Sequence, residues 1–72
     1  MVNRKALLQA IERSGLTMNE VSERMGIPVE TLDLKSQSVT EFFVSEIESF
    51  CEICGLSTRM EKAYVFFYAL AL

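Results

Sequence analysis

Apolar side chains recur at helical spacing along most of this chain, and short polar turns separate the apolar segments. Leu7, Leu8 and Ile11 give residues 3–14 one apolar face, as expected of a helix that packs against a core. Asn3 is a residue type that accepts hydrogen bonds from the free N–H groups at a helix start. The pattern therefore predicts a first helix from about residue 3 to residue 14.

Two short helices joined by a tight turn should follow. Thr17 and Glu20 have the spacing of a capping box, in which each side chain accepts a hydrogen bond from the other residue's backbone N–H. Gly26 can adopt the positive φ that ends the second helix and turns the chain. Pro28 suits the first turn of a third helix, because its missing N–H has no partner there. We expect this helix to run to about Lys35.

The connector after the third helix changes character halfway, since residues 36–44 begin polar and end apolar. Ser45 and Glu48 offer another capping box, so the fourth helix should begin near Ser45 and end at Cys54. Phe42, just before this helix, is expected in the core. Phe43 is the better candidate for exposure.

The end of the chain is its most apolar part. Ser57 or Thr58 should cap a fifth helix over residues 59–65. Residues 66–72 combine Ala and Leu, which favour helix, with aromatic residues, which favour extended backbone. We expect the helix to continue well into this segment. The chain of 72 residues is then one all-α domain of five helices, with a helix-turn-helix at about 17–35 and an apolar tail at 63–72.

Composition narrows the functional classes. Half of the residues are hydrophobic, which predicts a folded core. The apolar run of residues 63–72 is about half of the ~20 residues that a membrane span requires. The start of the chain has no apolar signal-peptide segment. We therefore expect a cytoplasmic protein that does not enter the membrane.

The two cysteines form a Cys-x-x-Cys motif, which is also found in redox pairs and in half of a zinc site. The chain has no histidine and no other cysteine to complete a zinc site. Cys51 and Cys54 continue an apolar stripe with Ile47 and Phe50 at helical spacing. The preferred interpretation is a pair of reduced core thiols. We expect no metal, no cofactor and no enzymatic activity, because no nucleophile has an adjacent base.

The net charge and its distribution disfavour a DNA-binding surface. The net charge is −3 and the pI is about 4.8, whereas DNA-binding domains usually present a basic face. Residues 28–54 hold six carboxylates and one lysine, so this region has a net charge of −5. The acidic excess falls where a helix-turn-helix would meet the duplex.

The order of elements resembles the Cro/CI-like (lambda-repressor-like) family of helix-turn-helix phage regulators, over nearly the whole chain. The stretches that carry the resemblance are Gly15-Leu16-Thr17, Met25-Gly26-Ile27, Thr31-Leu32, Lys35, Thr40-Glu41-Phe42, Val44-Ser45-Glu46-Ile47, Cys51-Glu52-Ile53, Gly55-Leu56-Ser57 and residues 61–67. The resemblance implies five helices, with the third placed as a recognition helix.

This chain departs from the family at the positions that should face DNA. The family often has Gln where Met18 stands, and polar residues where Pro28, Val29, Glu30 and Leu34 stand. Base edges are read by side-chain donors matched to guanine and adenine, and these residues lack them. The sequence instead predicts an exposed apolar patch with an acidic rim, which is ordinary anatomy for a protein interface. The apolar residues of this prediction are Met18, Pro28, Val29 and Leu34, and the acidic ones are Glu30, Asp33 and Glu41.

Within the family, the chain is most similar to the small antirepressors of temperate phages. That resemblance implies binding to the N-terminal DNA-binding domain of a CI-type repressor in a bacterial host, which blocks operator recognition and favours lytic growth. The predicted partner-binding residues are Met18, Pro28, Val29, Glu30, Asp33, Leu34, Phe43, Tyr64, Phe67 and Tyr68.

Other interpretations stay open. The chain could be a Cro-like DNA-binding repressor, acting alone or jointly with a CI-type repressor, with Lys35 and Gln37 as its remaining DNA contacts. It could also form a homodimer through the apolar tail. In a simpler interpretation, Val29 and Leu34 pack against the fourth helix or the tail, and the nearby carboxylates are only solvated charges.

Overall fold

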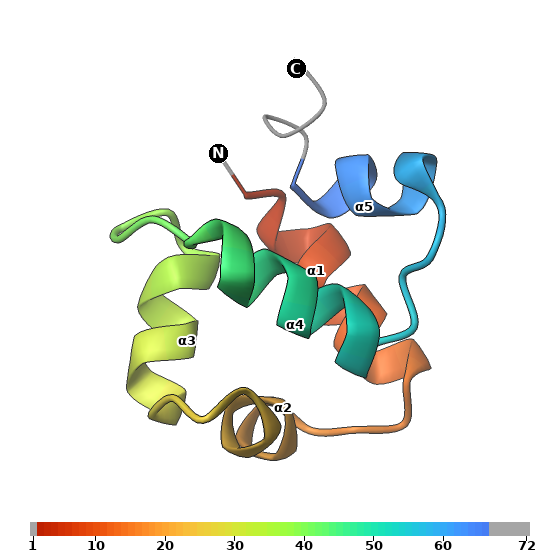
Figure 1. The fold of residues 1–72 in the computed structure, drawn as a ribbon. Helices are drawn as coiled ribbons and strands as arrows, with labels where there is room; N and C mark the ends of the chain where they lie inside the picture. Colours follow the sequence, from red (N-terminus) through yellow and green to blue (C-terminus); the bar gives the residue numbers. More distant parts are fainter. Residues whose placement is uncertain (1, 67–72) are drawn as a thin grey trace.

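The computed structural model describes residues 2–66, which form five helices and no strand (Figure 1). This result confirms the all-α prediction. The helices are α1 (Arg4–Arg13), α2 (Met18–Met25), α3 (Val29–Ser36), α4 (Val44–Ile53) and α5 (Arg59–Val65). None of these helices is long and apolar enough to cross a membrane.

The first two helix starts are fixed by the predicted caps. The Asn3 side chain accepts a hydrogen bond from the Ala6 N–H at 3.1 Å and begins α1. Thr17 and Glu20 form the capping box of α2, with N···O distances of 3.1 and 2.9 Å. Gly26 ends α2 with a φ of 77°, a left-handed conformation that favours glycine. Only three residues separate α2 from α3, so the predicted tight turn is confirmed.

Helix α4 begins earlier than the sequence predicts. The predicted capping pair of Ser45 and Glu48 is wrong, because α4 starts at Val44 and places Ser45 inside the helix. Glu46 reaches back instead, and its Oε1 accepts the Phe43 N–H at 2.9 Å. Phe43 has no side-chain acceptor to return the bond, and the Glu46 N–H donates instead to the Phe43 backbone carbonyl oxygen at 2.9 Å.

Helix α5 begins as predicted and stops before the apolar tail. Thr58 and Glu61 form its capping box. The predicted continuation is not seen at Phe66, whose backbone leaves the helical region and whose ring is fully buried. The rest of that prediction concerns residues 67–72, which lie outside the described residues.

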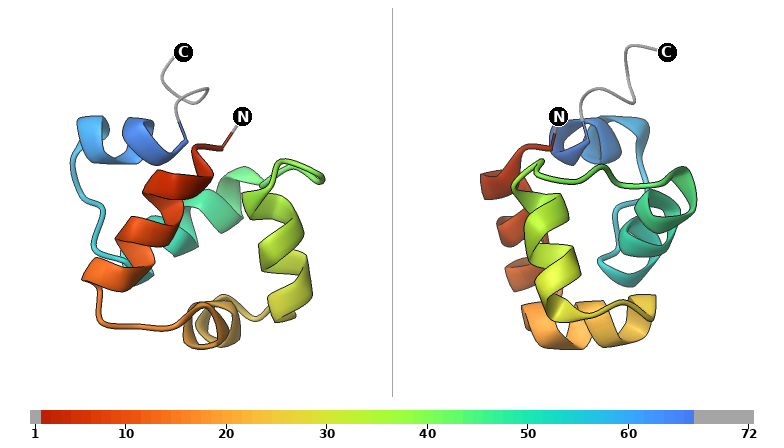
Figure 2. Two further views of the ribbon diagram at one scale, coloured as in Figure 1. Left: turned by 180° about the vertical axis from the view of Figure 1, so that it is seen from behind. Right: turned by 90° about the vertical axis from the view of Figure 1, so that its left-hand side faces the viewer.

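The core gathers one apolar face from every helix. Helix α2 packs against α1, α3 and α4, and α1 packs against α5 (Figure 2). Phe42 is buried as predicted, and Cys51 and Cys54 are free thiols inside the core, which confirms their predicted packing role. The residues of the core cluster are Ala6, Leu7, Ala10, Ile11, Val21, Leu32, Phe42, Phe50, Cys51, Cys54, Leu56, Val65 and Phe66.

Helices α1 and α5 meet at one end of the fold. The Asn3 N–H donates to the Val65 carbonyl oxygen at 2.9 Å, which joins the start of α1 to the end of α5. In both views of Figure 2, the end of α5 lies next to the start of α1. This end of the fold therefore depends on contacts between residues far apart in the chain.

Candidate functional site

A group of large apolar side chains remains exposed around the connector between α3 and α4. Leu34, Val39, Phe43 and Val44 are between 42 % and 73 % exposed, and we call these four residues the apolar patch. They come from the last turn of α3, the connector and the first residue of α4. The connector folds back on α3, because the Val39 N–H donates to the Leu34 carbonyl oxygen at 3.0 Å. Exposed apolar surface of this kind is typical of protein interfaces.

Two adjacent phenylalanines of the connector differ in burial, one facing the core and the other facing solvent. Phe42 is 6 % exposed and belongs to the core, whereas Phe43 is 66 % exposed. The backbone at Phe43 is extended, with φ −78° and ψ 154°, and successive side chains on extended backbone point in opposite directions. The predicted exposure of Phe43 is therefore confirmed.

Lys35, predicted as a remaining DNA contact, lies beneath this surface. The residue is only 6 % exposed. Its ammonium Nζ donates to the Glu41 carbonyl oxygen at 2.8 Å, pairs with Glu46 Oε1 at 2.9 Å, and lies 4.5 Å from the centroid of the Phe43 ring. This ammonium is buried and already paired with a carboxylate, so it is poorly placed to bind phosphate. The structure therefore favours a structural role for Lys35.

The contacts of Glu46 with Lys35 and Phe43 also affect its pKa. Burial raises the pKa of this carboxyl, but hydrogen bonds from the Phe43 N–H and from Lys35, together with the charge of Lys35, outweigh burial and lower the pKa overall. Glu46 therefore stays ionised at neutral pH and keeps both hydrogen bonds.

A second ion pair holds α1 against α3. Arg4 Nη2 lies 3.1 Å from Asp33 Oδ1, and the guanidinium also donates to the Ser36 hydroxyl. Gln37 Nε2 donates to the other Asp33 oxygen at 2.8 Å. The carboxylate of Asp33, predicted as part of a free acidic rim, is thus shared between two donors. Gln37, the other predicted DNA contact, already has an acceptor.

The remaining predicted residues fall into four groups. Pro28 and Glu30 are exposed at the start of α3, as the predicted face requires. Val29 and Met18 are half-buried, and Met18 packs against the core cluster. Tyr64 is exposed on α5, which lies away from α3 in Figures 1 and 2, so the structure does not bring it to the apolar patch. Phe67 and Tyr68 lie outside the described residues.

Two members of the patch were not assigned by sequence reasoning. Val39 lies in the connector and Val44 is the first residue of α4, and neither is among the partner-binding residues that the sequence predicts. Their exposure could have been inferred from the sequence, because this run of apolar residues has no predicted core surface to pack against. When these two residues are included, the observed apolar surface is centred nearer to the start of α4, whereas the predicted surface was centred at the start of α3.

The surroundings of the patch are acidic. Glu30 and Glu41 are exposed, as are Glu48 and Glu52 along α4. Arg4 and Lys35, the cations that the structure places at α3, each lie in an ion pair with a carboxylate. The local potential is therefore negative, which repels a polyanion and attracts a cationic surface.

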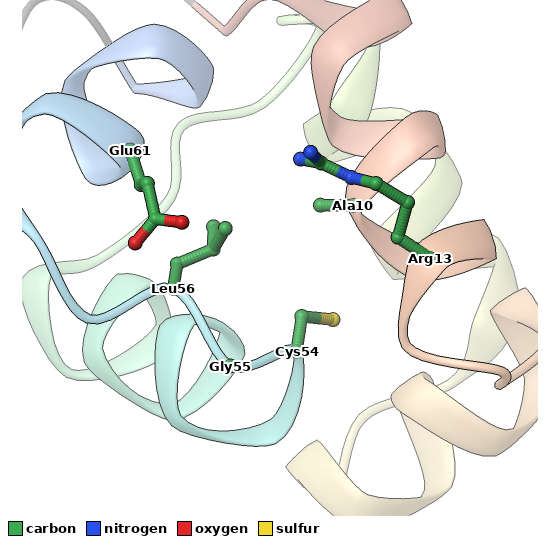
Figure 3. A pocket seen from close by; sticks show the side chains of 6 residues that line it. All are labelled: Ala10, Arg13, Cys54, Gly55, Leu56 and Glu61. Atoms are coloured by element: carbon green, nitrogen blue, oxygen red, sulfur yellow. The ribbon is translucent and has the colours of Figure 1, made fainter.

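A small pocket lies away from this surface, between the end of α1 and the turn before α5 (Figure 3). It encloses about 220 Å³, and Arg13 and Glu61 face it from opposite sides. Burial raises the pKa of the Cys54 thiol in its wall to about 11. Since the thiolate is the nucleophile, the raised pKa leaves only a small reactive fraction of this cysteine at neutral pH. Hydrogen bonds from Thr58 and Ser57 lower the pKa of Glu61, which serves as the cap of α5.

Residues 2–66 contain no cluster of three or more side chains that could hold a metal ion. Comparison with protein-family models, with curated proteins and with solved structures finds no match to this chain. The resemblance to Cro/CI-like regulators therefore stays a prediction from the residues, and the surface itself must carry the functional argument.

Proposed function

We propose that this protein is a small antirepressor that binds the DNA-binding domain of a CI-type helix-turn-helix repressor and blocks its access to operator DNA. The observation that carries the proposal is the surface formed by α3, the connector and the start of α4. It presents hydrocarbon and carboxylate outward, while Lys35 beneath it is paired with Glu46.

A DNA-binding role for this surface is disfavoured on physical grounds. Phosphate contacts by Lys and Arg supply most of the affinity of a protein for DNA. At this surface, Lys35 is buried and Arg4 is shared between Asp33 and Ser36. Leu34 and Phe43 offer no donor to a base edge, and the exposed Glu30 would approach phosphates of its own sign.

The same features suit a cationic protein partner. An interface commonly has an apolar centre and a polar rim, and complementary charge speeds its formation. A repressor's DNA-binding face is basic because it must neutralise phosphates, and covering it prevents operator binding. The chain resembles the small antirepressors of temperate phages, and in length and pattern it is similar to the modulators of repression of lactococcal phages. This resemblance supports the same partner and a shift towards lytic growth.

An operator mobility shift tests the proposal. The probe is a purified CI-type phage repressor bound to its labelled operator DNA, and the purified protein is titrated into the complex. We expect it to release the repressor in proportion to its concentration and to bind the operator poorly by itself. Tight, sequence-selective and salt-sensitive binding of the operator by this protein alone would contradict the proposal and favour a Cro-like repressor.

Variants locate the surface. Leu34→Arg and Phe43→Arg place cations in the apolar patch, and each should weaken repressor release by at least about tenfold, as expected for central interface residues. The control is Met60→Arg, which changes an apolar residue on α5 that is more exposed than Leu34 or Phe43. If both patch variants release the repressor fully and the control variant does not, the interface lies on α5 and not on the apolar patch.

A further inference from the structure

We infer that Lys35 is a positioning residue, which together with Glu46 holds the exposed Phe43 as a preformed anchor for the partner. The inference rests on the proposed function, because it assigns Phe43 a role in binding. It goes further by separating the residue that contacts the partner from the buried pair that prepares it.

The first support is the convergence of three bonds on the connector. Glu46 Oε1 accepts the Phe43 N–H at 2.9 Å and pairs with Lys35 Nζ at the same distance. Lys35 Nζ also donates to the Glu41 carbonyl oxygen at 2.8 Å. One ion pair therefore fixes the backbone on both sides of Phe42, and through it the point from which the Phe43 side chain leaves the surface.

The second support is the contrast in burial. The side chains of Lys35 and Glu46 are only 7 % and 16 % exposed, whereas Phe43 is 66 % exposed. The ammonium lies 4.5 Å from the ring centroid, a position typical of a cation–π contact. One face of the ring is thus occupied from within, and the other parts of the ring remain available to a second molecule.

Such an arrangement is useful for binding, whatever it contributes to the stability of the fold. Desolvation offsets much of the attraction within a buried ion pair, so the pair is weak evidence for stability. An exposed phenylalanine loses rotamer freedom when a partner covers it, and holding it in place beforehand removes that cost from association. Rigid aromatic anchors near the centre of a surface commonly dominate binding.

The experiment combines affinity with a spectroscopic signature. Calorimetry measures binding of the repressor's DNA-binding domain to the unaltered protein, Lys35→Met, Phe43→Ala and the double variant. Lys35→Met keeps the length and hydrocarbon of the side chain but removes its charge. We expect this change to weaken binding about threefold to tenfold, the cost of ordering one side chain. It should have little further effect once Phe43 is alanine.

The control variant is Arg4→Met, which breaks the other ion pair of this region, with Asp33. It should leave affinity near that of the unaltered protein, since Arg4 has no contact with Phe43 among its hydrogen bonds and ion pairs. Lys35→Arg should restore most of the affinity, because the guanidinium can also pair with Glu46. Circular dichroism and thermal melting confirm that each variant is folded.

Nuclear magnetic resonance provides the readout that does not depend on the partner. The ε-methylene protons of Lys35 should be shifted upfield by the Phe43 ring, and the shift should disappear in Phe43→Leu. Absence of this shift in the unaltered protein would overturn the inference. Equal losses from Lys35→Met with and without Phe43 would also overturn it.

Two further outcomes separate this inference from the proposed function. If the unaltered protein shows the ring shift but does not bind the repressor domain, the proposed antirepressor role fails and the positioning of Phe43 by Lys35 stands. If Lys35→Met lowers affinity for nonspecific duplex DNA at low salt and reduces its salt dependence, Lys35 contacts phosphate and the inference is wrong.

Discussion

Phe42 and Phe66 meet edge to face, with ring centroids 5.2 Å apart and an angle of 83° between their planes. Phe66 makes a similar contact with Phe50 of α4, at 5.6 Å and 84°. Edge-to-face pairs are favoured geometries for aromatic side chains. The three rings therefore join the connector, α4 and the end of α5 in one part of the core, directly behind the backbone that carries Phe43.

The adjacent residues Phe42 and Phe43 should behave oppositely on truncation. Phe42→Ala removes a buried ring and should lower the free energy of unfolding by about 3–5 kcal/mol. Phe43→Ala removes an exposed ring and should change it by less than about 1 kcal/mol. Urea denaturation followed by circular dichroism measures both. Similar losses from the two variants would mean that Phe43 packs in the core.

The capping box of α2 should contribute measurably to stability. Thr17→Ala removes the side-chain acceptor for the Glu20 N–H, and we expect the free energy of unfolding to fall by about 1 kcal/mol. The comparison is Thr40→Ala, an exposed connector position at which we expect no loss. Thermal melting of both variants at neutral pH tests the difference, and equal melting temperatures would exclude a stabilising cap.

The contribution of Glu46 should depend on pH in a defined direction. Its pKa is lowered in the folded protein, so the native state binds this proton less tightly than the unfolded state does. The stabilisation is therefore complete above the ordinary glutamate pKa and disappears as the pH falls through the lowered value. We expect the stability difference between the unaltered protein and Glu46→Gln to be largest near neutrality and to shrink below about pH 4.

Urea titrations at several pH values from neutral to acid measure this difference. A matched series with Glu48→Gln, an exposed residue of the same helix, corrects for the general effect of acid on the chain. A stability difference for Glu46→Gln that grows towards acid pH would reverse the sign of the prediction.

The thiol of Cys54 should resist alkylation while the protein is folded. Burial raises its pKa to about 11, so the thiolate fraction at pH 8 is far below that of an ordinary cysteine, whose pKa is about 8.5. In a Cys51→Ala background, iodoacetamide should label Cys54 slowly under native conditions and rapidly in urea. Mass spectrometry follows the reaction, and fast native labelling would show that the thiol is more accessible than the structure indicates.

Helix limits could be predicted from the sequence because caps are local. Asn3, Thr17 and Thr58 each bond a backbone N–H three residues away, and the sequence places α1, α2 and the start of α5 accordingly. The start of α4 could not be settled in this way. Two carboxylates, Glu46 and Glu48, each lie three residues after a possible cap, and spacing alone does not distinguish them.

The candidate site was harder to predict, because its side chains are held by residues that are distant in the sequence. Lys35 was expected at the surface, but Glu46 and the Glu41 carbonyl oxygen hold it inside. Asp33 was expected to be free, but Arg4 of another helix lies beside it. Local pattern identifies which residues are charged, whereas only the packing of α1, α3 and α4 determines which charges neutralise one another.

The hydrogen bond between the Asn3 N–H and the Val65 carbonyl oxygen has a consequence for how the protein is made. Helix α1 precedes its partner α5 in the chain, so α1 is synthesised well before α5. Contacts between such distant segments cannot form early, since the intervening chain must first be ordered. We expect the nascent chain to leave the part of α1 that packs against α5 uncovered until α5 has been synthesised.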